Sequence, residues 1–74
     1  MSLAHDGCRF TLTNAGAGAS DVYRLSVTGG TIPNALAALK VGESQQITVT
    51  TSARATLKAT SEADPTVSAT STCQ

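Results

Sequence analysis

Two cysteines near opposite ends of the chain place the strongest constraint on how it can fold. Cys8 shares the apolar phase of an alternating segment with Phe10 and Leu12, and Cys73 shares that phase with Val67. Side chains two residues apart on a β-strand lie on the same face, so both thiols should face the core. We predict a Cys8–Cys73 disulfide that closes nearly the whole chain. The alternative is two unrelated buried thiols in a reducing compartment.

The composition indicates one small domain with a thin core. The chain has 74 residues, of which 41% are hydrophobic, but it contains one Phe, one Tyr and no Trp. A disulfide is a common supplement to a core of this size. The net charge is zero, and no basic stripe or long apolar run is present. We therefore predict no nucleic-acid partner and no membrane span.

The same composition, rich in Ser, Thr, Ala and Gly, suits a secreted or cell-surface protein, as does the cysteine pair. No signal-peptide pattern follows Met1. We therefore expect a mature or excised domain at 8–74. Residues 1–7 are expected to form an N-terminal tail, with Met1 to Leu3 left from an expression start.

Alternation of apolar and hydroxyl-bearing residues dominates the chain and predicts short strands with one buried face. The expected strands lie at 8–13, 21–28, 44–51, 54–60 and 66–73. A glycine-containing loop at 14–20 and the Asp64-Pro65 turn signal separate strands. This pattern predicts an all-β, antiparallel β-sandwich.

The stretch at 31–41 admits two interpretations. It could form one helical turn beginning at Asn34, because alanine and leucine follow. It could also be an irregular crossover that carries Ile32, Leu36 and Leu39 over an open end of the core. We favour the crossover, because a single helical turn is marginal without tertiary support.

The order of motifs resembles that of bacterial extracellular immunoglobulin-like sandwiches. The pattern Leu-Thr-Asn-x-Gly at 12–16 precedes Asp-x-Tyr-x-Leu-x-Val at 21–27, and Leu-x-x-Gly-Glu-Ser follows at 39–44. These segments are similar to the galactosidase-associated β-sandwich domain and to the cell-adhesion-related (CARDB) group. The resemblance covers about residues 8–73, and its motifs encode turns and alternation rather than chemistry.

The resemblance implies a fibronectin III-like sandwich of about 5–7 strands. The stretch between Gly30 and Val41 is short for these families, so one or two middle strands are expected to be missing. No clear strand precedes Cys8, so an exposed sheet edge is expected there. The resemblance also places the first and last strands in different sheets, running in opposite directions. A Cys8–Cys73 bond would then pin the two sheets together at one end.

Few residues suggest reaction chemistry. His5, the only histidine, has Asp6 beside it and could act as a base for a serine, but it precedes the first expected strand. The cysteines lack the Cys-x-x-Cys spacing of redox or zinc sites. Glu62 and Asp64 share a loop and are the lesser candidates for Ca²⁺, although turn carboxylates are more often solvated. We predict no catalytic residue and no cofactor.

The resemblance implies a non-catalytic accessory or spacer module of a larger secreted bacterial protein, such as a hydrolase. Its partners would be the other domains of that parent protein. The alternative is an adhesion module that binds a surface glycan or protein. The contact region would then be an unpaired edge strand or the hairpin around Glu62 and Asp64. Phe10 and Tyr23 are in phase with the core and would leave no ring exposed for stacking on sugars.

Overall fold

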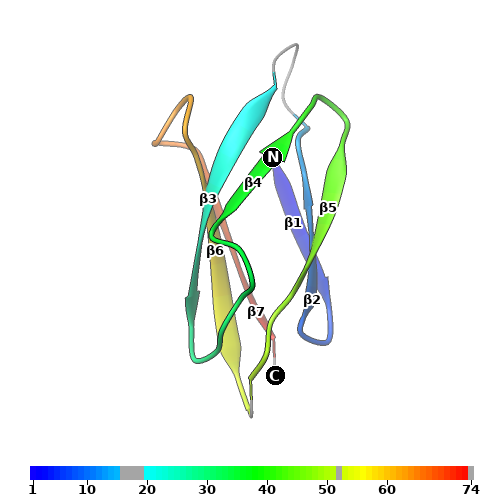
Figure 1. Cartoon of the computed structure of the whole chain (residues 1–74), viewed down its shortest axis with the longest axis vertical. Helices are drawn as coiled ribbons and strands as arrows, with labels where there is room; N and C mark the ends of the chain where they lie inside the picture. Colours follow the sequence, from blue (N-terminus) through cyan, green and yellow to red (C-terminus); the bar gives the residue numbers. More distant parts are fainter. Residues whose placement is uncertain (16–19, 52, 74) are drawn as a thin grey trace.

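The computed structural model describes residues 1–15, 20–51 and 53–73, and in these segments the chain forms seven strands and no helix (Figure 1). The strands are β1 (Ser2–Asp6), β2 (Arg9–Thr13), β3 (Asp21–Thr28), β4 (Leu36–Leu39), β5 (Ser44–Thr48), β6 (Ala55–Ser61) and β7 (Ser68–Cys73). It follows that none of the described segments holds a helix long and apolar enough to cross a membrane.

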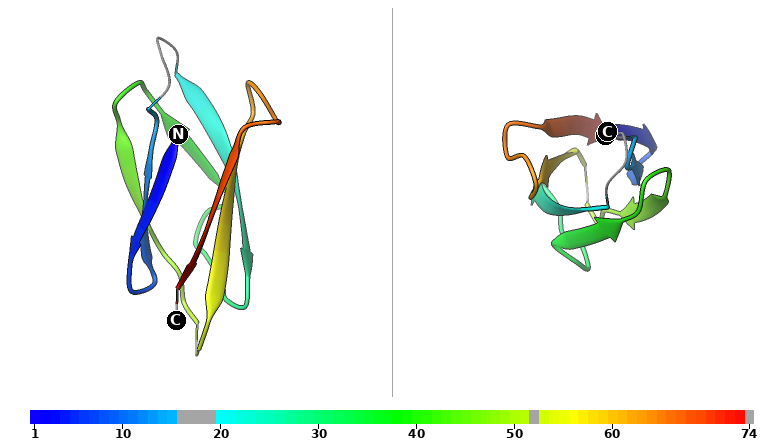
Figure 2. Two further views of the ribbon diagram at one scale, coloured as in Figure 1. Left: turned by 180° about the vertical axis from the view of Figure 1, so that it is seen from behind. Right: turned by 90° about the horizontal axis from the view of Figure 1, so that it is seen from above.

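The strands form two antiparallel sheets that pack face to face (Figure 2). One sheet has the order β1-β2-β5, and the other has the order β4-β3-β6-β7. Three strands facing four in this order give the immunoglobulin-like, fibronectin III-like arrangement. The predicted fold class, a small antiparallel β-sandwich, is therefore confirmed.

The core lies between the sheets and follows the alternation of the strands. Phe10, Leu12 and Leu57 are fully buried, and Tyr23 is 3% exposed. Burial raises the pKa of Tyr23, as does the neighbouring Asp21 carboxylate, so its phenol stays neutral at ordinary pH. The remaining buried apolar residues are Leu25, Ala37, Leu39, Ile47, Val49, Ala55, Ala59 and Cys73.

The expected tail at 1–7 is wrong, because Ser2–Asp6 form β1. This strand pairs with β2 in antiparallel register, with Leu3 opposite Leu12, and Leu3 packs against the core. Gly7 adopts a φ of 61° and reverses the chain between the two strands. The exposed edge therefore lies at β1 rather than at β2. A single large apolar residue in this segment gives no alternation, so the sequence pattern could not indicate a strand.

The expectation for 31–41 is also corrected, since a strand rather than a crossover or helical turn occupies Leu36–Leu39. It pairs with β3, with Arg24 opposite Leu36. Ala37 and Leu39 enter the core, while Leu36 is 56% exposed. Alanines on both faces hid this alternation, and the free edge of β3 supplies the hydrogen-bond partners that make the strand stable. A middle strand is thus present in the stretch where one or two were expected to be missing.

Smaller differences concern strand ends. Val67 was expected to share the buried face with Cys73, but it is 41% exposed, because β7 begins at Ser68, two residues after the predicted start. The strand expected at 44–51 ends at Thr48, after which Thr50 forms an isolated bridge with Thr31. Residues 16–19 of the loop expected at 14–20 lie outside the described residues.

Two leucines give a matched test of this packing. Leu57→Ala should lower the free energy of unfolding by about 2–5 kcal/mol, because it leaves a cavity at a fully buried site. Leu36→Ala makes the same chemical change at a site that is 56% exposed and should cost well under about 1 kcal/mol. Urea unfolding followed by circular dichroism measures both. A loss below about 0.5 kcal/mol for Leu57→Ala would place Leu57 outside the core.

Candidate functional site

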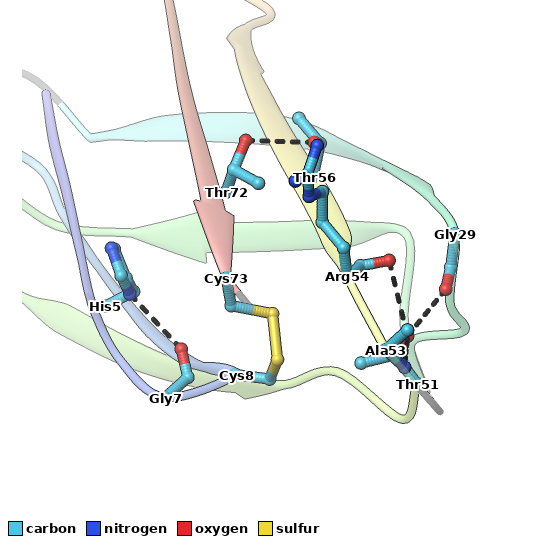
Figure 3. The surroundings of a disulfide bond; sticks show 10 residues. All are labelled: His5, Gly7, Cys8, Gly29, Thr51, Ala53, Arg54, Thr56, Thr72 and Cys73. Atoms are coloured by element: carbon cyan, nitrogen blue, oxygen red, sulfur yellow. Dashed lines mark hydrogen bonds between the residues drawn. A yellow bond between two sulfur atoms is a disulfide. The ribbon is translucent and has the colours of Figure 1, made fainter.

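A disulfide between Cys8 and Cys73 joins the two sheets covalently at one end of the sandwich (Figure 3). Cys8 directly precedes β2 in the three-stranded sheet, and Cys73 ends β7 in the four-stranded sheet. Their Cα atoms are 5.1 Å apart, within the usual range for linked cysteines. Cys73 is fully buried and Cys8 is half-buried. The predicted pair is present, and the described part of the chain holds no free cysteine.

Close backbone packing surrounds this end of the sandwich. Gly29 follows β3 with a φ of 86°, and a Cβ at this position would collide with the carbonyl of Arg54. The Thr51 hydroxyl donates a hydrogen bond of 2.7 Å to the carbonyl of Gly29 (Figure 3). Both the backbone conformation and the available space therefore require glycine here.

A buried asparagine connects the sheets at the opposite end. Asn14 follows β2 and is 2% exposed. Its Nδ2 donates to the carbonyl of Leu39, the last residue of β4, at 3.1 Å. Its backbone N–H donates to the carbonyl of Glu43 at 3.0 Å, and its own carbonyl accepts from the N–H of Gly42 at 2.8 Å. The Leu-Thr-Asn and Leu-x-x-Gly-Glu motifs therefore contact each other in space.

The turn at 40–43 presents the backbone groups of Gly42 and Glu43 that bind Asn14. The N–H of Glu43 donates to the carbonyl of Lys40 at 2.9 Å, and Gly42 has a φ of 81° at the third position. A positive φ at this position is characteristic of a type II turn. The Glu43 carboxylate also accepts from the N–H of Lys40 at 3.1 Å, which closes the turn a second time.

Asp21, at the start of β3, forms hydrogen bonds with the last residue of β6 and with the segment that follows it. Its carboxylate accepts hydrogen bonds from the Ser61 hydroxyl, from the N–H of Ala63 at 3.2 Å and from the N–H of Val22 at 2.7 Å. The Ser61 hydrogen bond is the largest cause that holds the pKa of Asp21 below its usual value. Desolvation opposes it, and the backbone hydrogen bonds from Ala63 and Val22 add smaller lowering effects. Ser61 is itself 4% exposed, so this contact reaches into the core.

The two candidate calcium ligands have separate protein partners. Glu62, which directly follows β6, forms an ion pair with Arg24 on β3. Asp64 Oδ1 accepts from the Thr66 hydroxyl at 2.6 Å and from the Thr66 N–H at 3.1 Å, and these bonds lower the pKa of Asp64. Across 1–15, 20–51 and 53–73, no three His, Cys, Asp or Glu side chains form a group suited to a metal ion.

His5 lies on β1 opposite Phe10, and their ring centroids are 5.9 Å apart. The His5 Nδ1 donates to the carbonyl of Gly7 at 3.2 Å, within its own hairpin. Asp6 lies opposite Arg9 in the β1–β2 register. The histidine thus makes local contacts in the hairpin, and the base, carboxylate and serine arrangement considered from the sequence is not assembled by these contacts.

An open hollow of about 570 Å³ lies beside the start of β3 and the end of β4. The residues that line it are Ser20, Asp21, Val22, Ala38, Leu39, Lys40, Glu43, Glu62 and Ala63. A second hollow of about 410 Å³ adjoins it along β4 and shares Val22 and Glu62 with it. Val22, which lines both hollows, is 37% exposed, and Leu36, which lines the second, is 56% exposed. Both hollows therefore have a partly apolar floor.

These features define a class of protein: a small β-sandwich in which one disulfide joins cysteines near the two ends of the chain. Polar side chains connect its strands and turns. Asn14 and Asp21 were not predicted to have these roles. Their partners lie 25 and 40 residues away in sequence, and a pattern of neighbouring residues carries no signal for such distant contacts.

A model of the Peptidase M6-like domain family matches residues 18–74. The match covers more than half of the chain, so the chain belongs to the Peptidase M6-like domain family. It includes the whole four-stranded sheet, β5 and Cys73. Searches of curated proteins and of solved structures gave no match. The resemblance to the galactosidase-associated and CARDB groups is not tested by these comparisons and stays a prediction.

Removing the disulfide should destabilise the fold strongly. The Cys8→Ala/Cys73→Ala variant should lose about 4 kcal/mol of unfolding free energy, because the chain-entropy model assigns that value to a loop of this length. Urea unfolding measures the loss, and thiol titration of the wild-type protein should find no free thiol. A loss below about 1 kcal/mol would mean that the other contacts alone hold the sheets together.

The Asp21 contacts predict a pH-dependent stability. Because the folded state lowers the pKa of this carboxyl, its stabilisation is complete above the ordinary value of 3.8 and is lost as pH falls through the lower folded value. Asp21→Asn should therefore be less stable than wild type near neutral pH, and this difference should narrow in acid. Urea unfolding of both proteins near neutral pH and in acid measures this difference in stability.

Ser61→Ala provides the control for this prediction, since the Ser61 hydroxyl is the largest cause of the Asp21 shift. In the Ser61→Ala background, Asp21→Asn should show a smaller dependence on pH. A difference between Asp21→Asn and wild type that stays constant from neutral pH to acid would contradict the assigned role of this carboxylate.

Proposed function

We propose that the chain is a non-catalytic accessory or spacer module of a larger secreted bacterial protein, and that this parent protein is a peptidase or another hydrolase. Membership of the Peptidase M6-like domain family supports a parent of this class. The Cys8–Cys73 disulfide supports an extracellular location, because disulfides persist in oxidising compartments.

The observation that carries the spacer role is the placement of the chain ends. The start of β1 and the end of β7 lie at opposite ends of an elongated body (Figure 1). Its principal dimensions are 38 × 20 × 18 Å. Segments that precede β1 and follow β7 would therefore be held apart along the long axis, and a spacer requires this geometry.

The roles of the polar groups support a non-catalytic module. Asn14 and Asp21 connect strands that are distant in sequence, Asp64 closes a turn, and Glu62 is paired with Arg24. A catalytic site instead needs groups held in geometry to act on a substrate. Sandwiches of this kind host many unrelated functions, so these contacts bear on the role of the module more directly than its fold does.

The second candidate is a module that binds a surface glycan or protein. The hollow beside β3 and β4 favours it, because Val22 and Ala38 form an apolar floor while Lys40 and Glu62 add charge of both signs. Polar groups around an apolar floor are common in binding sites. The hollow lies next to the hairpin that was expected to make such contacts.

A retention assay separates the two candidates. The labelled domain is incubated with insoluble polysaccharides, bacterial cell wall and immobilised matrix proteins, with and without Ca²⁺. We expect retention no greater than that of an inert protein of similar size. We also expect no peptide-bond hydrolysis by the domain alone beyond that of a boiled sample.

Matched variants identify the surface if retention is found. Val22→Lys alters the hollow, and Ser26→Lys makes the same change on the outer face of the same strand, outside the hollow. Saturable retention that Val22→Lys abolishes and Ser26→Lys preserves would replace the spacer role with the binding role.

A further inference from the structure

The disulfide divides the chain into two unequal parts. Residues 9–72 lie inside the covalent loop that Cys8 and Cys73 close, whereas β1 lies outside it. A load that enters before β1 and leaves after Cys73 has a covalent path of only about eight residues and one disulfide. The other strands are attached to this path but are not part of it.

We propose that this module is an inextensible, tension-bearing link: tension between its flanking segments passes along β1 and through the Cys8–Cys73 bond and bypasses the rest of the sandwich. The mechanical property rests on the covalent topology alone. Its biological use rests on the spacer role proposed above, which it makes more specific.

The orientation of β1 leaves the path little slack. The strand starts at one end of the body, and Cys8 lies at the other end, beside Cys73 (Figures 1 and 3). A β-strand already rises about 3.2–3.4 Å per residue, and a fully stretched chain reaches only about 3.3–3.6 Å. Tension can therefore lengthen this path by only a few ångströms.

The direction of the load also protects the hydrogen bonds of β1. This strand pairs with β2 and lies against β7. Because its far end is held by Cys8, tension acts along a strand that is anchored at both ends. The load does not need to separate β1 from β2.

Without the bond, the same load would act on the folded core. β1 and β7 run in the same direction (Figure 1), and tension would pull them in opposite senses along their axes, past their partners β2 and β6. Once these pairs separated, residues 9–72 would unravel and add on the order of 220 Å of extended chain. With the disulfide, tension lengthens the module by a few ångströms; without it, tension lengthens the module by about 220 Å.

The position of the bond matters as much as its presence. A crosslink at any inward-facing position could join the two sheets and stabilise the fold. Here Cys73 is the last residue of β7, and Cys8 lies in the turn between β1 and β2. Few other positions would enclose so much of the domain while keeping an extended strand outside the loop.

Single-molecule pulling tests the proposal. The module is expressed in a tandem array that alternates with a disulfide-free marker domain of known unfolding length. Oxidised wild-type arrays should lengthen only by the steps of the marker. Arrays that carry Cys8→Ala/Cys73→Ala should gain a further extension of about 220 Å for each module.

The readout does not depend on whether the variant folds. An unfolded module contributes the same total contour length, but without a force peak. The wild-type protein is checked by thiol titration before pulling. A gain of about 220 Å per module in oxidised arrays, or no gain in the variant, would overturn the proposal.

The experiment is separate from the retention assay. Saturable binding there would end the spacer role while the mechanical result stood. Full extension of the oxidised array would end the mechanical inference while leaving an ordinary spacer in place.

Discussion

The attachment of two small sheets to each other is the constraint on which the whole structure depends. Each sheet is antiparallel and stable only when its apolar face is covered, and the core that covers it has Phe10 and Tyr23 as its only aromatic residues. The disulfide fixes the sheets at one end, and Asn14 fixes them at the other. Small residues such as Ala55 and Ala59 can fill the space between because the sheets are held in register from both ends.

Many polar side chains in the described part of the domain form hydrogen bonds with backbone groups of the domain itself. Asp21 and Asp64 carry lowered pKa values because hydrogen-bond donors of neighbouring segments stabilise their charged forms. Perturbed carboxylates often mark catalytic sites, but structural networks perturb them too. In this member of the Peptidase M6-like domain family, the shifts are explained by a strand start and a turn. The apolar floor around Val22 supports only the second proposal, a surface for binding a partner.

The sequence was sufficient where large side chains alternate with polar ones. Strands around Phe10, Tyr23 and Leu57 were predicted in the correct phase, and the phase of the cysteines predicted their pairing. β1 and β4 were missed because Ser2–Asp6 holds one large apolar residue and Leu36–Leu39 has alanine on both faces. Asn14 and Asp21 were missed for another reason: their roles arise only after folding brings distant segments together.

The closed loop also changes what a protease can do to this domain. A single cut anywhere within residues 9–72 hydrolyses one peptide bond, but the fragments stay joined through Cys8 and Cys73. Whatever precedes β1 stays covalently attached to whatever follows β7. Only a cut outside the loop, before Cys8 or after Cys73, severs that connection. A protease can therefore cut the domain anywhere within residues 9–72 without separating the segments on either side of it.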